Sequence, residues 1–111
     1  LGGAFVEIEN QATRTHVVMS GSSLEARLVL NMSNAANTGD VVMQCDIDAA
    51  FGSPTTLLTV NNPSSGISVS SWTAVPSGEC KTSGGVYLRA GMSGGDGIEN
   101  PEVRFAKLQL R

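Results

Sequence analysis

Two carboxylates stand two positions apart in the chain, at Asp46 and Asp48. If residues 40–48 form an extended strand, both side chains project from the same face roughly 7 Å apart, because successive side chains alternate between the faces of a strand. Such a pair can hold a hard cation such as Ca²⁺, or act as acid and base in sugar cleavage. The competing interpretation is a solvated outer face whose charges prevent unwanted edge pairing. Both residues are kept as candidate ligand-binding positions.

A glycine-rich segment, residues 91–102, contains a second set of oxygen ligands. Its glycines permit a tight backbone path, so Asp96, Glu99 and Asn100 can gather around a Ca²⁺ ion. The segment has no Gly-Lys-Ser/Thr sequence, so it does not match a phosphate-binding P-loop. The alternative is a plain connection between the last two strands. Apart from a Ca²⁺ ion in this segment, the sequence suggests no cofactor.

Trp72 and Tyr87 are the two aromatic residues best suited to stacking on a sugar ring. In the strand expected over residues 67–73, Trp72 has the opposite parity to Ile67 and Val69, which places it on the outer face. An exposed Trp in that position offers an apolar ring face to a pyranose. The interpretation we favour is that Trp72 instead fills the core, with the small residues Ser68 and Ser70 beside it.

The chain shows no evident catalytic constellation. His16 is the only histidine, which excludes metal sites built on several histidines. A Ser–His–acid triad would also depend on this one residue, and its Val- and Met-rich surroundings favour a structural or exposed position. A glycosidase needs an aromatic-lined cleft, whereas this chain has one Trp, one Tyr and three Phe. We therefore expect no catalytic residue and no enzymatic activity.

Cys45 and Cys80 are the only cysteines, and they are suited to a single disulfide. They form neither a C-x-x-C motif nor a Cys/His metal set. A bridge across the 34 intervening residues would add about 3–4 kcal/mol of stability in the chain-entropy model. Because disulfides persist in oxidising compartments, we expect an extracellular location, either secreted or on a cell or virion surface.

The overall composition excludes several classes of partner. The 111 residues carry a net charge of −3, and only 15% of them are charged. The seven Lys and Arg residues are scattered, whereas binding of nucleic acid depends on clustered positive charge, so no nucleic-acid partner is expected. No stretch approaches the roughly 20 apolar residues of a spanning helix, so no membrane insertion is expected. The length fits a single domain over residues 1–111.

The dominant period of the sequence is two, which indicates β-strands. The clearest strand, residues 24–33, places on one face Leu24, Ala26, Leu28, Leu30 and Met32. A second strand, residues 40–48, places on one face Val41, Met43, Cys45 and Ile47, and on the other Asp40, Gln44, Asp46 and Asp48. Both strands therefore have one face suited to a core and one suited to water.

Six further strands are expected with weaker patterns, over residues 4–9, 16–20, 57–60, 67–73, 86–92 and 103–110. If the strand at 86–92 extends back far enough, Cys80 also faces inward. In the last strand the apolar parity shifts by one residue, which predicts a β-bulge near Phe105 and Ala106.

About eight strands separated by Gly-, Ser-, Pro- and Asn-rich turns predict an all-β fold, a two-sheet antiparallel β-sandwich. Eight strands with several long connections favour a jelly-roll-like arrangement. The alternative is an immunoglobulin-like sandwich, which expects a Tyr two residues before the second Cys, where this chain has Gly78. In their rhythm, the strands at 86–90 and 103–110 resemble those of small jelly-roll domains in secreted bacterial proteins and in phage tails and capsids.

The weakly charged surface, rich in Ser, Thr, Asn and Gly, suits contact with protein neighbours or with sugars. We therefore expect a non-catalytic extracellular or virion-surface β-sandwich module with a structural or attachment role, either as a homo-oligomer or within a larger assembly. Its partners would be other protein subunits or surface glycans. The alternative function is a carbohydrate-binding module that uses Trp72, Tyr87, Asp46 and Asp48, assisted by Ca²⁺ at Asp96.

Overall fold

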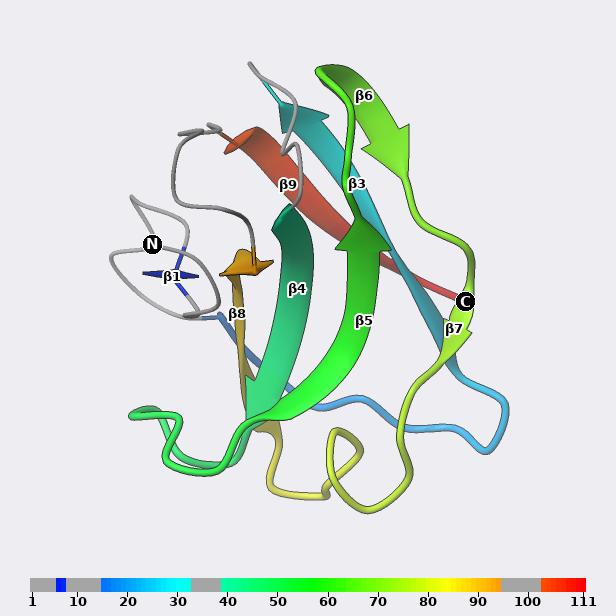
Figure 1. Ribbon diagram of the computed structural model, residues 1–111. Coiled ribbons are helices and arrows are strands. Elements are labelled where there is room, and N and C mark those ends of the chain that lie inside the picture. The colour runs from blue at the N-terminus through cyan, green and yellow to red at the C-terminus, as the bar shows by residue number, and fades with distance from the viewer. Residues whose placement is uncertain (1–5, 8–14, 33–38, 95–102) are drawn as a thin grey trace.

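The computed structural model describes residues 6–7, 15–32, 39–94 and 103–111 of the chain (Figure 1). Within these ranges the backbone forms nine strands, which are β1 (Val6–Glu7), β2 (Thr15–Val17), β3 (Glu25–Met32), β4 (Gly39–Asp46), β5 (Thr55–Asn61), β6 (Gly66–Val69), β7 (Thr73–Ala74), β8 (Val86–Gly94) and β9 (Val103–Leu110). The same residues contain no helix with the length and apolar character needed to cross a membrane.

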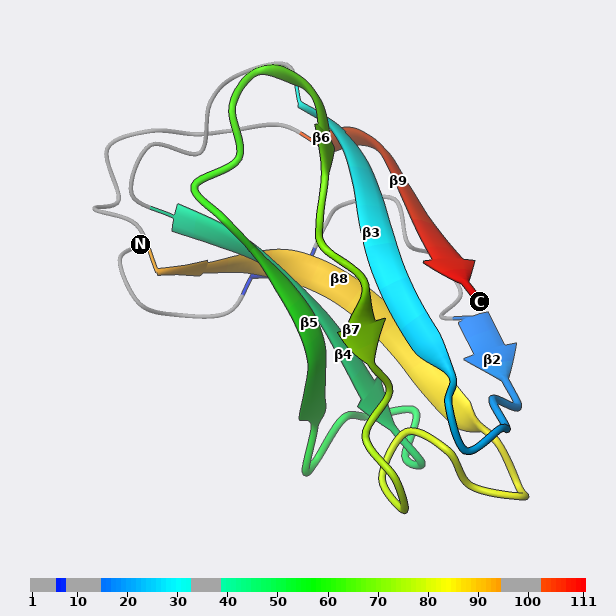
Figure 2. The same cartoon turned by 90° about the vertical axis from the view of Figure 1, so that its right-hand side faces the viewer.

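The strands form two antiparallel sheets. In the first, called the β8 sheet, β8 lies between β4 and the short strands β1 and β2, and β5 forms the far edge. In the second, called the β3 sheet, β3 lies between β9 on one side and β6 with β7 on the other. Figure 2 shows the two sheets as separate layers facing one another. The fold is therefore all-β with two antiparallel sheets, consistent with the β-sandwich predicted from the sequence.

Strand β3 shows the predicted alternation most clearly. Ala26, Leu28 and Leu30 are fully buried and Met32 is 2% exposed, whereas the side chains between them are half-buried. The inward face of this strand is thus confirmed. The face turned away from the other sheet, called the outer face, is formed on β3 by Glu25, Arg27, Val29 and Asn31.

The core between the sheets joins β3 to β4, β5 and β8. From these three strands it receives, among others, Val41, Met43, Leu57, Leu58, Val86 and Leu88. Leu57 and Leu58 are both buried although they are adjacent, because the pairing of β4 with β5 shifts by one residue at this point.

Two details of the predicted strands are corrected. Strand β4 ends at Asp46, so Ile47, which was predicted on the buried face, lies in the following turn and is 69% exposed. The irregularity in β9 falls one residue earlier than predicted, because Phe105 lies opposite Asn31 while Val103 lies opposite Met32. The first predicted strand is observed only as β1, and its other residues lie outside the described ranges.

The strand pairing is nested along the chain. Strand β4 pairs with β5, β3 pairs with β6 and β7, and β2 pairs with β8, always antiparallel. Along the sequence, β3 and its partners flank the pair β4–β5, and β2 and β8 flank both. This is the pairing that a single long hairpin would have. Because β4 also pairs with β8, and β3 with β9, this long hairpin is rolled into two layers.

The predicted disulfide is confirmed. Cys45 on β4 is bonded to Cys80, with both side chains buried and their Cα atoms 5.7 Å apart. Strand β8 begins at Val86, so it does not extend back to Cys80. A turn closed by a hydrogen bond from the Gly85 N–H to the Thr82 carbonyl, of 3.0 Å, lies between them. The bridge therefore fastens the connection between β7 and β8 to the end of β4.

Removal of the disulfide is expected to lower the free energy of unfolding by about 3–4 kcal/mol, because the bridge closes a loop over a sequence separation of 35. The Cys45→Ala/Cys80→Ala variant should unfold at a lower urea concentration when followed by circular dichroism. Dithiothreitol should lower the midpoint of the wild-type protein and leave that of the variant unchanged. Equal midpoints for the oxidised wild type and the variant would show that the bridge adds no stability.

Candidate functional site

The outer face of the β3 sheet carries a tryptophan whose ring contacts two arginines. The Cζ atom of Arg27 lies 4.5 Å from the centroid of the Trp72 ring, and that of Arg111 lies 4.3 Å from it. Arg27 belongs to the outer face because Ala26 and Leu28, on either side of it, point into the core. Trp72 is therefore a half-buried residue of the outer face and does not fill the core.

A break between β6 and β7 lets Trp72 reach this position. Strand β6 ends at Val69, and β7 begins at Thr73. In the gap, the Ser70 N–H donates to the Leu28 carbonyl and the Ser70 hydroxyl oxygen accepts the Leu28 N–H, both at 2.9 Å. Because a serine hydroxyl replaces a backbone carbonyl in the ladder, the next two residues leave the strand path. The Trp72 ring can then reach over β3 towards the end of β9.

The predicted face of β6 is wrong. Ile67 and Val69, which were predicted to point inward, are 67% and 49% exposed. They lie directly opposite Asn31 and Val29, which are outward residues of β3. The parity that related Trp72 to Ile67 and Val69 does not hold, because residues 67–73 are not one continuous strand. Val29, Ile67 and Val69 are referred to below as the apolar strip.

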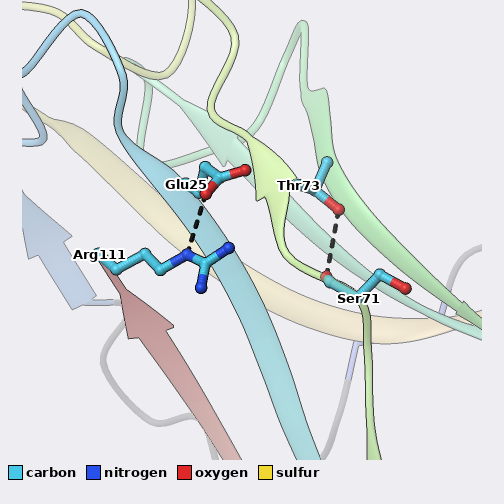
Figure 3. Close-up of polar contacts among 4 residues, drawn as sticks. All are labelled: Glu25, Ser71, Thr73 and Arg111. Carbon is cyan, nitrogen blue, oxygen red and sulfur yellow. Dashed lines mark hydrogen bonds and ion pairs between the residues drawn. The ribbon is translucent and has the colours of Figure 1, made fainter.

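Each arginine at the Trp72 ring is held by a second contact. Arg27 Nε donates to Oε1 of Gln109, which lies directly opposite on β9, at 2.6 Å. Arg111 Nε donates to Oε1 of Glu25 at 2.9 Å, and these two residues also exchange backbone hydrogen bonds of 3.0 Å. Figure 3 shows Arg111 reaching from the end of β9 to Glu25 on β3. Trp72 and these four residues are called the Trp72 cluster.

The Trp72 cluster is a preorganised cationic surface. Ring stacking and the Nε hydrogen bond fix each guanidinium, and no partner for the terminal nitrogens is found among the described residues. A fixed guanidinium binds a carboxylate through two parallel N–H groups. Lys107 lies exposed on the same face, so among the described side chains three cations stand there against the carboxylate of Glu25. The face is thus suited to an anionic group.

The carboxylate of Asp46 binds the backbone of the β4–β5 loop, residues 47–54. Asp46 is 7% exposed, and its two oxygens accept the N–H groups of Asp48 and Ser53, each at 2.9 Å. Asp48 is exposed in the turn, where its Oδ1 accepts the Ala50 N–H at 3.0 Å. Because the strand ends at Asp46, the two carboxylates do not project side by side from it as predicted. A solvated position is observed for Asp48 but not for Asp46.

Phe51 fastens the same loop to the outer face of the β8 sheet. It has a φ of 55°, its N–H donates to the Asp48 carbonyl at 2.9 Å, and its side chain is 5% exposed. The Cζ atom of Arg89 lies 4.4 Å from the Phe51 ring centroid. Arg89 Nε in turn donates at 2.8 Å to Oε1 of Gln44, directly opposite on β4. The loop is held at several points and leaves Ile47 exposed at its start.

Tyr87 lies on the outer face of the β8 sheet, on the opposite side of the molecule from Trp72. It is directly opposite His16 on β2 and Asp46 on β4. The His16 and Tyr87 ring centroids are 4.6 Å apart. Gly85 leaves room for the imidazole, since a Cβ there would lie 2.7 Å from His16 Cε1. The four predicted ligand-binding residues therefore do not gather in one site.

The predicted metal ligands Asp96, Glu99 and Asn100 lie outside the described residues. Over the ranges that the structure does describe, no group of three or more His, Cys, Asp or Glu side chains is placed to hold a metal ion.

Sequence reasoning misses the residues that organise the two outer faces, namely Arg27, Gln109, Arg89, Gln44 and Phe51. The available signal is an outward Arg on one strand and an outward Gln on a neighbour. That signal becomes specific only when the register between the two strands is known.

No family model, no curated protein and no solved structure matches this chain. Any conclusion about its function therefore rests on the charges, ring contacts and strand pairing of the described residues.

Asp46→Ala is expected to lower the free energy of unfolding by about 1–3 kcal/mol, because it removes the acceptor of two backbone N–H groups. Amide hydrogen exchange at Asp48 and Ser53 should become faster. The matched control is Asp48→Ala, which removes a single exposed contact and should change stability by no more than about 0.5 kcal/mol. Equal effects of the two substitutions would show that the Asp46 carboxylate does not hold the loop.

Trp72 is the only tryptophan, so its fluorescence reports directly on the cluster. Arg27→Ala should shift the emission to longer wavelength and increase quenching by acrylamide, with a loss of about 0.5–1 kcal/mol of stability from the lost cation–π contact. Lys81→Ala removes a cation that bonds the Gly21 carbonyl elsewhere, and it should leave the emission unchanged. Unchanged emission in Arg27→Ala would contradict the stacked arrangement.

Proposed function

We propose that this domain is a non-catalytic extracellular β-sandwich module with a structural or attachment role in a larger assembly of protein subunits. The observation that carries the proposal is the outer face of the β3 sheet, where the exposed apolar strip adjoins the Trp72 cluster. Contiguous exposed apolar patches with a polar rim are typical of interaction surfaces.

The apolar strip supplies a driving force for association. Val69 lies directly opposite Val29 on β3. Ile67, two positions before Val69, lies on the same face of β6. Ile67 and Val69 are 67% and 49% exposed. Full burial of a side chain of this size contributes about 1.5–3 kcal/mol, so covering the strip favours a protein partner. The stiff χ1 of β-branched residues keeps the entropic cost of that burial small.

The Trp72 cluster adds the residue types that dominate binding energies at protein interfaces. Trp and Arg are enriched among such residues. Arg27 and Arg111 are already ordered by the ring and by their Nε hydrogen bonds, so binding costs little additional side-chain entropy.

An extracellular location is supported by the disulfide between Cys45 and Cys80, because such bonds persist in oxidising compartments. A surface with few charged residues, which make up 15% of the chain, agrees with contact to neighbouring subunits more than with binding to a polyanion.

We also infer a jelly-roll arrangement of the two sheets, and the nested strand pairing supports it. A jelly roll has two four-strand sheets built from interlocked Greek keys, as a rolled long hairpin produces. The pairs β4–β5, β3–β6 and β2–β8 follow that nesting. The immunoglobulin-like alternative has its disulfide between facing strands of the two sheets, whereas Cys80 lies in the connection before β8.

The carbohydrate-binding alternative has less support. The Trp72 ring already has two guanidinium groups within 4.5 Å of its centroid, so a sugar would have to displace one of them. Tyr87 is packed against His16 and lies on the other outer face, so the two aromatic residues cannot contact one sugar together.

Sedimentation velocity over increasing protein concentration tests the proposed function. The wild-type domain is expected to form species larger than the monomer, and Ile67→Ser/Val69→Ser should weaken this association at least about tenfold, because less apolar surface is covered. Thr56→Ser/Thr59→Ser, at exposed positions of β5, is the matched control and should associate as the wild type does. A wild-type domain that remains monomeric at every concentration contradicts the proposal.

A further inference from the structure

The two outer faces of the sandwich carry opposite charge. Among the described side chains, the face of the β3 sheet has three cations against one acid, namely Arg27, Lys107 and Arg111 against Glu25. The face of the β8 sheet, with the β4–β5 loop folded onto it, has three acids against one cation, namely Asp40, Asp46 and Asp48 against Arg89. One face is therefore basic although the whole chain has a net charge of −3.

On the acidic face, the β4–β5 loop presents an apolar and an acidic residue next to each other. Ile47 is 69% exposed, and Asp48 beside it is exposed as well. The other two acids are engaged within the molecule, since Asp46 accepts two backbone N–H groups and Asp40 Oδ1 accepts the Asn62 N–H at 3.1 Å. Asp48 is therefore the carboxylate most available to a partner. The loop is already fixed, so its presentation requires no further ordering.

On the basic face, cationic and apolar groups also lie next to each other. Arg27 and Val29 are outward residues of β3 two positions apart, and hence about 7 Å apart. Arg111 contacts the same Trp72 ring as Arg27, and Val69 lies directly opposite Val29. The terminal nitrogens of both arginines have no partner among the described residues, so within that part of the chain they are available to an anionic group.

We propose that the β4–β5 loop of one copy docks on the outer face of the β3 sheet of a second copy. The Asp48 carboxylate binds the guanidinium groups of Arg27 and Arg111, while Ile47 packs on the apolar strip beside Val69. This contact rests on the proposed role as an assembly module, and it names the partner and the residues that join the two copies.

The charges select a front-to-back contact. A two-fold symmetric contact through the β3 sheet would place the same basic face on both sides of the interface, where like charges repel. A front-to-back contact instead joins the basic face of one copy to the acidic face of the next. It leaves one free Trp72 cluster and one free β4–β5 loop at the two ends. Further copies can therefore be added, to give a ring or an open chain.

Charge reversal followed by sedimentation velocity tests the contact. Asp48→Lys and Arg111→Glu are each expected to weaken self-association at least about tenfold, because each opposes like charges across the interface. An equimolar mixture of the two variants should regain association, since the intact Asp48 of one meets the intact Arg111 of the other. Raising the salt concentration from about 50 mM to about 300 mM should weaken the wild-type association.

Two further variants complete the experiment, one as a control and one as a substitute. Glu79→Lys makes the same charge change at an exposed acid in the connection between β7 and β8, and it should associate as the wild type does. Lys107→Glu, at an exposed residue of the basic face, takes the place of Arg111→Glu if thermal unfolding shows that the latter does not fold.

The inference is overturned if Asp48→Lys and Glu79→Lys weaken association equally, or if the mixture does not regain it. In either case, an association that is still lost in Ile67→Ser/Val69→Ser leaves the proposed function standing. A wild-type domain that never associates contradicts both. A change in Trp72 fluorescence on adding polygalacturonic acid, without self-association, would assign the cluster to an acidic glycan and would also overturn the inference.

Discussion

Strand β3 lies between the apolar core and the charged outer face, and the other strands are positioned by their pairing and packing with it. Its inward residues fill the middle of the core, and its outward residues carry charge. Because β3 is paired along both edges, its backbone is used within the sheet, and only its side chains are available to other molecules. A slip of one residue would exchange the two sets and direct Arg27 into the leucines of the core.

The two outer faces are organised by the same combination of residues. It consists of Arg27, Gln109 and Trp72 on the β3 sheet, and of Arg89, Gln44 and Phe51 on the β8 sheet. In each case the Gln oxygen fixes the arginine Nε, and a ring from an irregular segment covers the guanidinium and the strand beneath it. The faces differ in that a second arginine reaches the Trp72 ring, which adds to the positive charge of that face.

Alternation along single strands was enough to predict the inward faces of β3 and most of β4, and the cysteine count was enough to predict the disulfide. The face of β6 was predicted wrongly, because its apolar residues Ile67 and Val69 point outward, and this follows only from their pairing with Asn31 and Val29. The continuity of residues 67–73 fails because the Ser70 hydroxyl takes the place of a backbone carbonyl in the ladder. The burial of Asp46 depends on N–H groups of the loop after it, which alternation does not consider. The contacts of Trp72 depend on the register between distant strands, which one sequence does not provide.

Two adjacent residues at the end of β4 fix the strand in opposite directions, and this determines how the domain would respond to force. Cys45 is fixed inward by a covalent bond, and Asp46 is fixed outward to the β4–β5 loop. Tension applied to that loop therefore reaches a covalent bond within two residues. Since β4 lies between β5 and β8, the remaining force acts along two strand pairs in shear, where many hydrogen bonds must break together. Force on that loop is therefore resisted first by the covalent bond and then by the two strand pairs of β4.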